Sequence, residues 1–262
     1  MGSSTSFALS LSGGGVCSLA YAGFDEVLRQ HKMDPACYAG LSGGAILAVL
    51  LASNMTADNI LKFFLHLKTF KILNTHLSHI EIIDHTKLIL LLRDLLPYKT
   101  FEDLPTRAAV FASDVTKKEP VLINTGDIAS ALVASCSLFP LLQPVKRRGI
   151  LLGDGGMTVY YGANYIRQLG FKKVVGVDVT GLSVGPVYGL LSALYKQINT
   201  TLSENARHEL EEWPVDVDVR ITFPRQSIFS LQRKAHHFVN FGRKTAQTYL
   251  SRLQHLASPP QH

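Results

Sequence analysis

Short apolar segments alternate with amphipathic segments along most of this chain, and this alternation restricts the possible folds more than any other feature. Apart from Asp178, segment 174–179 is apolar, and such a segment indicates a strand buried on both faces of a sheet. Chains with this order place helices on both faces of a mostly parallel sheet. We therefore expect an α/β fold with three layers, α/β/α, around a mostly parallel central sheet.

The expected elements follow from apolar periodicity and from the turn residues between them. Strands are expected at 7–11, 38–41, 108–113, 121–123, 150–152, 174–179 and 215–223. Helices are expected at 18–30, 43–52, 56–67, 80–95, 128–135, 163–169, 187–199 and 228–256, the last as one long basic helix or a helix pair. Asp127 is placed to cap helix 128–135, and Gly170 to end helix 163–169.

The turn after the second strand contains the pentapeptide Gly40-Leu41-Ser42-Gly43-Gly44. A G-x-S-x-G sequence between a strand and a helix is typical of a sharp turn that projects a nucleophilic serine. Flanking glycines allow strand and helix to approach closely, and the following helix directs its positive end at the site. We interpret Ser42 as a candidate nucleophile, although a plain turn is the alternative.

The turn after the first strand contains Gly13, Gly14 and Gly15. Consecutive glycines expose backbone N–H groups that can bind a phosphate or an oxyanion. A dinucleotide fingerprint would need glycine where Ser18 stands, and a Walker A loop would need Gly-Lys-Ser/Thr, which is absent. With a candidate serine nucleophile nearby in sequence, an oxyanion-binding loop is the better interpretation.

A third glycine-flanked turn, Gly153-Asp154-Gly155-Gly156, follows a short apolar strand. Asp-Gly is a common turn dipeptide, so this motif gains its weight from the other two. In open α/β sheets, ligands bind at the carboxyl ends of the strands, where all three turns are expected. Asp154 is therefore a candidate partner of Ser42.

These three motifs, in this order, resemble the patatin-like phospholipase family. Parts of the intervening sequence, at 101–104, 110–115, 134–145 and 174–179, resemble the family as well. The resemblance implies a single patatin-like domain over 6–250, with short flexible termini at 1–5 and 251–262. It also implies a Ser42–Asp154 dyad without histidine, acting on phospholipids or other lipid esters as a phospholipase A or lysophospholipase. No metal and no cofactor are expected.

Two departures from the family pattern stand near the motifs. The glycine loop usually continues with a basic residue and a further glycine, where this chain has Cys17 and Ser18. After the Asp motif the family often has Asn and Pro, where this chain has residues 159–162 of sequence Val-Tyr-Tyr-Gly. The first departure bears on the rigidity of the oxyanion loop, and the second on the shape of the acyl pocket.

Two alternative functions remain open from the sequence. A Ser-His-Asp esterase is possible in chain order, with His236 or His237 after Ser42 and Asp154. A catalytically weak binding module with the same fold is suggested by Cys17 and Ser18. Nucleic-acid binding has only the charge in its favour, since no recognised motif is present.

The net charge of +6 favours anionic partners. Cations in the closing segment are interleaved with apolar residues, as a helix docking on an anionic membrane would require, while packing against the core is the alternative. These residues are Arg225, Phe229, Arg233, Lys234, Phe238, Phe241, Arg243, Lys244, Tyr249, Leu250 and Arg252.

Other features bear on the location of the protein. No apolar stretch is long enough to span a membrane. Three separate cysteines suggest a reducing, cytoplasmic environment. We also expect peripheral contact with a membrane. Gly2 fits a loose N-myristoylation pattern, for which a plain N-terminal extension is the simpler interpretation.

Overall fold

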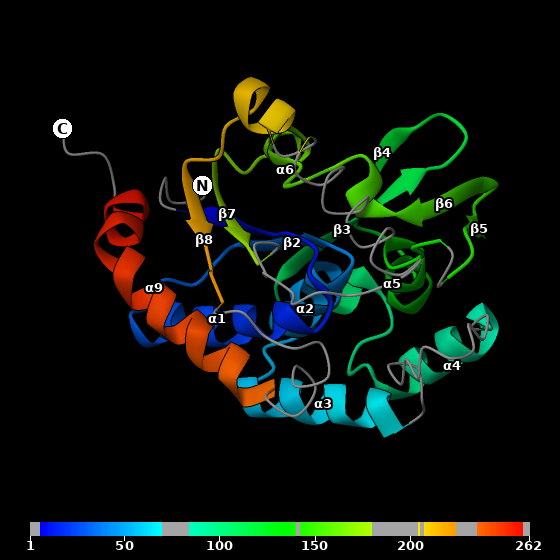
Figure 1. The fold of residues 1–262 in the computed structure, drawn as a ribbon, viewed down its shortest axis with the longest axis horizontal. Helices are drawn as coiled ribbons and strands as arrows, with labels where there is room; N and C mark the ends of the chain where they lie inside the picture. Colours follow the sequence, from blue (N-terminus) through cyan, green and yellow to red (C-terminus); the bar gives the residue numbers. More distant parts are fainter. Residues whose placement is uncertain are drawn as a thin grey trace, which may run out of the picture.

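A mostly parallel sheet forms the centre of the molecule (Figure 1). The computed structural model of the chain describes residues 6–69, 84–139, 142–179, 204, 207–223 and 235–258. The parallel strands are, in spatial order, β3 (Arg107–Asp114), β2 (Cys37–Leu41), β1 (Phe7–Leu11), β7 (Lys173–Asp178) and β8 (Val217–Arg220). Three antiparallel strands extend the sheet at β3, namely β4 (Glu119–Ile123), β5 (Val145–Arg147) and β6 (Ile150–Asp154).

The chain order places a topological switch at β1. From β1 the chain proceeds to β2 and β3 on one side, and later returns to pair β7 with the other edge of β1. The connections leaving β1 and β7 therefore diverge at the carboxyl end of the sheet, because β1 leads to β2 and β7 leads to β8 on the other side. That is the position where open α/β sheets bind their ligands.

Helices cover both faces of this sheet. One face carries the larger core, formed with α1 (Ala20–Gln30), α2 (Gly43–Ala52), α3 (Ala57–Thr69), α4 (His85–Leu95), α5 (Ile128–Ser135) and α9 (Ala235–Ala257). The other face carries a smaller core beneath α6 (Ala163–Gln168). Short 3-10 helices follow the strands as η1 (Gly15–Leu19), η2 (Phe101–Asp103) and η3 (Gly155–Met157). The expected three-layer α/β/α architecture is confirmed.

Most expected elements are present, with shifted bounds. Strand β8 is shorter than the expected 215–223, and the short strand β5 was not expected. The expected helix 187–199 lies outside the described residues, as do the beginnings of helices 80–95 and 228–256. Helix α9 continues to Ala257, and Leu253 near its end is 2% exposed. Residues 251–257 therefore belong to the packed helix rather than to the flexible terminus that we expected, because Leu253 is buried.

Helix α9 uses its apolar side to pack against the core. Phe238 is buried, and Phe241, Tyr249 and Leu250 pack against the same cluster. Arg243 forms an ion pair with Glu26 of α1 at 2.8 Å. The described part of α9 therefore favours the packing alternative for its apolar residues. Arg225, Phe229, Arg233 and Lys234 lie outside the described residues.

Two glycines allow α1 and α9 to approach each other unusually closely. A Cβ atom on Gly23 would lie 1.9 Å from the carbonyl oxygen of Val239, and one on Gly242 would lie 1.8 Å from that of Ala20. Any side chain at either position would therefore push the two helices apart.

Replacing Gly242 by alanine should destabilise the fold by about 1–3 kcal/mol, because overpacking outweighs the gain in helix propensity. Urea unfolding followed by circular dichroism would show a lower midpoint with the same slope. Gln247→Ala, on the exposed side of the same helix, is the control and should leave the midpoint nearly unchanged. Equal midpoints for wild type and Gly242→Ala would contradict the close packing.

Candidate active site

Strand β3 holds two other strands on a single edge. Its residues 110–111 pair with both β2 and β4, so β2 and β4 lie on opposite edges. Its residues 112–114 pair with both β4 and β6, so β4 and β6 also lie on opposite edges. It follows that β2 and β6 share one edge of β3 and approach each other from opposite directions.

The meeting point of these two strands places Ser42 beside Asp154. Strand β2 ends with Leu41 paired to Phe111, and β6 ends with Asp154 paired to Ala112, the next residue of β3. Ser42 follows Leu41 directly. Two residues that are far apart in the sequence are therefore brought together, because both strands pair with the same edge of β3.

Ser42 occupies a strained turn between β2 and α2. Its φ of 50° and ψ of −125° are unfavourable for a residue with a side chain, at a typical cost of about 1–3 kcal/mol. The turn is tight because Gly40 and Gly44 allow backbone contact. A Cβ atom on Gly40 would lie 2.4 Å from the Gly44 oxygen, and one on Gly44 would lie 2.4 Å from the Leu11 oxygen. This is the geometry expected of a nucleophile elbow.

Ser135, the last residue of α5, braces this strained turn. Its hydroxyl accepts the Ser42 N–H at 3.0 Å and donates to the carbonyl oxygen of Phe111 at 2.6 Å. The hydroxyl thus connects the elbow to β3, and its residue is fully buried. Sequence analysis did not identify Ser135, because nothing in the surrounding Ala-Ser-Cys-Ser distinguishes it from its neighbours.

Asp154 presents a buried carboxylate at the end of β6. The residue is 4% exposed, and its Oδ1 accepts the Gly156 N–H at 2.8 Å. Its Oδ2 is buried and has no hydrogen-bond partner among the described residues. Burial raises the pKa of Asp154 to about 6, while the Gly156 N–H and the Ser42 hydroxyl lower it in part.

The glycine loop lies against the same turn. A Cβ atom on Gly13 would lie 3.5 Å from the Ser42 Cβ, and one on Gly43 would lie 2.9 Å from the Gly15 nitrogen. A Cβ atom on Gly14 would lie 2.5 Å from a Val179 methyl group. The loop backbone therefore approaches Ser42 closely, as an oxyanion-binding loop must.

A buried polar network holds the base of this loop. The Ser12 hydroxyl contacts the Tyr21 hydroxyl at 3.0 Å and donates to Asp178 Oδ1 at 2.8 Å. Tyr21 also donates to the Ser12 carbonyl oxygen at 2.9 Å. Because Asp178 ends β7 and Ser12 follows β1, the network joins two strand ends beneath the glycines. Sequence analysis did not identify Asp178 or Tyr21 as supports of the loop, and the contact between Ser12 and Asp178 spans 166 positions.

Cys17 and Ser18, the two departures from the family pattern, are both buried beside the loop. Burial raises the pKa of the Cys17 thiol to about 12, so the side chain is neutral where the family usually has a cation. The Ser18 hydroxyl has no hydrogen-bond partner among the described residues, and it lies 2.5 Å from where a Cβ on Gly43 would be. The loop here is supported by packing and by the Ser12 network instead of a basic side chain.

Residues 159–162, the second departure, are held by Glu209. Its carboxylate accepts the backbone N–H groups of Tyr160 at 2.8 Å and Tyr161 at 3.0 Å, together with those of Gly162 and Ala163 at the start of α6. A carboxylate at a helix N-terminus is favourable because it satisfies free N–H groups and the helix dipole. The segment after the Asp motif is therefore anchored without Asn or Pro.

Among the described residues, no histidine affects the Asp154 carboxyl. The influences that shift its pKa are burial, Gly156 and Ser42. His236 and His237 are exposed near the start of α9, where their rings contact each other. Within the described ranges, no group of three His, Cys, Asp or Glu side chains could hold a metal ion. No helix in those ranges is both long and apolar enough to cross a membrane.

Replacing Ser135 by alanine should release the elbow, because the Ser42 N–H and the Phe111 carbonyl would lose their shared hydroxyl. We expect the labelling of Ser42 by a fluorophosphonate probe to slow by about 10- to 100-fold, as small misplacements of a nucleophile do. Mass spectrometry of labelled peptides over time is the measurement.

Ser137→Ala is the matched control for this variant. Ser137 is also buried, but its hydroxyl donates to the carbonyl oxygen of Val133 in α5 and not to the elbow, so labelling should stay close to wild type. Equal labelling of Ser135→Ala and wild type would show that the elbow does not need this brace.

Known proteins resemble this chain in sequence and in fold. Over 186 residues it is 25% identical to uncharacterized NTE family proteins of Mycobacterium bovis and Mycobacterium tuberculosis, which covers 70% of this chain and 52% of each relative. The chain thus spans about half the length of these curated relatives. Over 190 residues it is 25% identical to a patatin-like phospholipase domain-containing protein of Caenorhabditis elegans, which covers 69% of this chain and 14% of that protein.

Two solved structures share the fold at low sequence identity. VipD from Legionella pneumophila has a TM-score of 0.52 at 16% identity, covering 95% of this chain and 67% of VipD. ExoU from Pseudomonas aeruginosa, solved in complex with SpcU, has a TM-score of 0.51 at 16% identity, covering 98% of this chain and 53% of the other. The family model of the patatin-like phospholipases matches residues 9–168, which include all three glycine-flanked turns. Since that match covers more than half of the sequence, this chain belongs to the patatin-like phospholipase family.

Proposed function

We propose that this protein hydrolyses carboxylic esters of lipids, with Ser42 as nucleophile and Asp154 as its general base. The observation that carries the proposal is the buried Asp154 carboxylate, whose Oδ2 lacks an ordinary hydrogen bond and whose pKa responds to the Ser42 hydroxyl. Serine nucleophiles need an adjacent base, and a carboxylate with a pKa near 6 is a better proton acceptor than an exposed one. Family membership supports an ester hydrolase in general.

The proposed reaction proceeds in two acyl-transfer steps. Asp154 accepts the proton of the Ser42 hydroxyl as the Ser42 oxygen attacks the ester carbonyl carbon. The N–H groups of Gly13, Gly14 and Gly15 stabilise the negative charge that develops on the carbonyl oxygen. The alcohol leaves with the proton from Asp154. Water then attacks the acyl-enzyme as Asp154 accepts one of its protons, and the bond from the acyl carbon to the Ser42 oxygen breaks as that proton passes to Ser42, which releases the carboxylic acid.

The substrate is proposed to be a phospholipid or another lipid ester. The basis is membership of a phospholipase family together with apolar side chains near the site, such as Met157, which is 46% exposed directly after the Asp motif. We also propose a reducing, cytoplasm-like location, because Cys17, Cys37 and Cys136 are all free thiols. Peripheral membrane contact is proposed because a lipid substrate would be found at a membrane.

Removing either member of the dyad should abolish the activity without unfolding the protein. Ser42→Ala and Asp154→Asn should each lower kcat/KM for a short, soluble ester by about 10³-fold or more, because each removes a group of the proposed chemical step. The measurement is steady-state hydrolysis beside circular dichroism, with fluorophosphonate labelling of Ser42 as an independent readout.

The double variant His236→Ala and His237→Ala is the control and should retain full activity. Loss of activity in that variant, with Asp154→Asn still active, would favour a Ser-His-Asp esterase instead. If wild-type protein neither reacts with the probe nor cleaves any ester, the binding-module alternative would replace the proposed enzyme.

The raised pKa of Asp154 predicts how stability depends on pH. The carboxyl is protonated in both states below about pH 4, and it is ionised in both above its folded pKa of about 6. Burying the ionised form costs stability, so the contribution of Asp154 declines as pH rises from about 4 to 6. Asp154→Asn should therefore stabilise the protein more at pH 8 than at pH 4, by up to about 3 kcal/mol. Urea unfolding at both pH values is the measurement.

Activity provides a second readout of the same ionisation. The base form is lost as pH falls through about 6, so wild-type kcat/KM should decline there. A rate that is flat from pH 5 to 8, or a stability difference that does not change with pH, would mean that Asp154 does not titrate as proposed.

A further inference from the structure

Two β-hairpins extend beyond the carboxyl end of the sheet, at the same end as Ser42. Strand β3 runs parallel to β1 and β2, while β4 and β6 run antiparallel to β3, and β5 runs antiparallel to β6. The turn between β3 and β4 and the turn between β5 and β6 therefore both lie at that end. Figure 1 shows the two hairpins side by side, away from α9.

The two turns carry a concentration of positive charge. Lys117 and Lys118 are exposed in the first turn, and Lys146 and Arg148 are exposed in the second hairpin. Glu119 is the exposed carboxylate next to them in the sequence. None of the four cations forms an ion pair with a carboxylate in the part of the chain that the structure describes.

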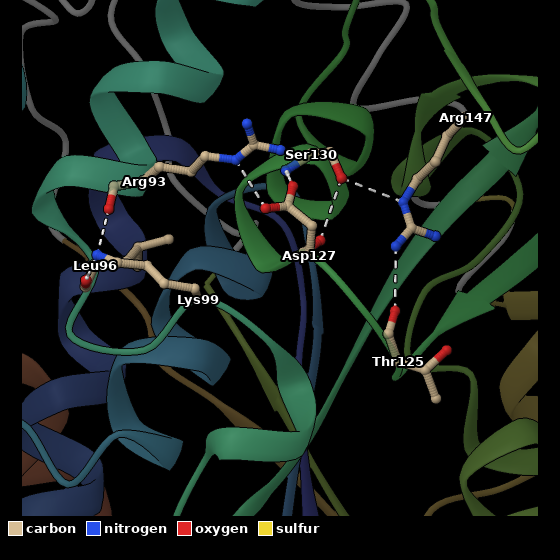
Figure 2. Close-up of polar contacts among 7 residues, drawn as sticks. All are labelled: Arg93, Leu96, Lys99, Thr125, Asp127, Ser130 and Arg147. Carbon is tan, nitrogen blue, oxygen red and sulfur yellow. Dashed lines mark hydrogen bonds and ion pairs between the residues drawn. The ribbon is translucent and has the colours of Figure 1, made fainter.

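The second hairpin has a tight two-residue turn at its tip. Arg148 and Gly149 have φ of 49° and 85°, as in the two-residue turn that suits twisted hairpins. Arg147 is held by neutral groups, since its guanidinium donates to the Ser130 hydroxyl at 3.4 Å and to the Thr125 carbonyl at 3.2 Å (Figure 2). Partial burial and the neighbouring charge of Arg148 lower the pKa of Arg147. An anion at this tip would relieve the repulsion between the two guanidinium groups.

The nearby acid in Figure 2 is already occupied. Asp127 caps α5 through the Ser130 N–H and accepts a hydrogen bond from Arg93 of α4 at 2.9 Å. Its carboxylate is therefore not available as a full partner for the hairpin cations. The positive charge of the hairpin turns is left to the solvent or to an external anion.

Exposed apolar side chains connect these turns with the dyad. Ile150 and Leu151 are 39% and 41% exposed on β6, four and three residues before Asp154. Leu151 pairs with Lys146 and lies on the same face of β6 as Gly153. A Cβ atom on Gly153 would lie 3.2 Å from the Met157 sulfur, so Met157 lies next to this face. Phe139 is 62% exposed, two residues after Ser137, whose carbonyl accepts the Asp154 N–H.

We propose that these two hairpins dock the protein on an anionic lipid bilayer, with the cations on the headgroups and the apolar residues in the interface. The docking surface consists of Lys117, Lys118, Lys146, Arg148, Ile150 and Leu151. The proposal rests on the proposed function, because docking here would bring the Ser42–Asp154 dyad to its lipid substrate. Aliphatic residues among cations suit a bilayer, whereas nucleic-acid surfaces favour cations with stacking aromatics. Helix α9 is a weaker candidate, since its described apolar residues pack inward.

The test is co-sedimentation of the full-length chain with vesicles at low and high salt. The vesicles are phosphatidylcholine alone, or phosphatidylcholine mixed with phosphatidylserine. Replacing Lys117, Lys118, Lys146 and Arg148 together by glutamine should weaken binding to the anionic vesicles by on the order of 100-fold at low salt, and less at high salt. Ile150→Gln with Leu151→Gln should weaken binding while preserving its dependence on salt.

A matched variant removes the same amount of positive charge elsewhere on the surface. In it, glutamine replaces four exposed residues outside the hairpins, Lys62, Lys172, Lys244 and Arg252. It should bind like wild type. The docking surface is overturned if both four-site variants lose binding equally, or if the hairpin variant binds anionic vesicles as wild type does. Tighter wild-type binding to duplex DNA than to anionic vesicles, lost in the hairpin variant, would also overturn it.

Hydrolysis of a short, soluble ester separates this proposal from the proposed function. The hairpin variant should cleave that ester at the wild-type rate, because no docking residue belongs to the dyad. Absence of hydrolysis in the wild type would refute the ester hydrolase while leaving the vesicle result to be judged by itself.

Discussion

The edge of β3 that β2 and β6 share is the constraint on which the site depends. Neither the elbow nor the Asp motif would form a pair by itself, because each is only a turn after a strand. Hydrogen bonding to consecutive positions of one strand places Leu41 beside Phe111 and Asp154 beside Ala112. The register of β3 thus sets the separation of the two candidate catalytic residues, and a slip by one residue would turn their side chains to opposite faces.

The electrostatics of the site follow from burial at this junction. An aspartate in water is a weak base, and hydrogen bonds to its carboxylate make it weaker still. Here the cost of burial exceeds the effects of the Gly156 N–H and the Ser42 hydroxyl, so the pKa rises from 3.8 to about 6. The protein accepts some loss of stability at this position, as it does at the strained Ser42 backbone.

The departures from the family pattern show how one arrangement can be supported in different ways. A buried neutral thiol at Cys17 stands where a cation is usual, and the Ser12–Asp178–Tyr21 network holds the loop from beneath. Glu209 anchors the backbone after the Asp motif, where Asn and Pro are usual. In each case backbone groups remain in place although the side chains that hold them differ.

The sequence alone determined the local features of this protein, because glycine patterns and apolar periodicity act over a few residues. The alternation of strands and helices predicted the α/β sheet, and the flanking glycines identified Ser42 and Asp154 as candidates. Tertiary structure decided everything that depends on contacts between distant segments. Ser135 braces the elbow from 93 positions away, and Glu209 reaches Tyr160 across 49. Burial of Asp154, the inward packing of α9 and the common direction of the two hairpins likewise arise only once the strands have paired, because each depends on which surfaces the folded chain encloses.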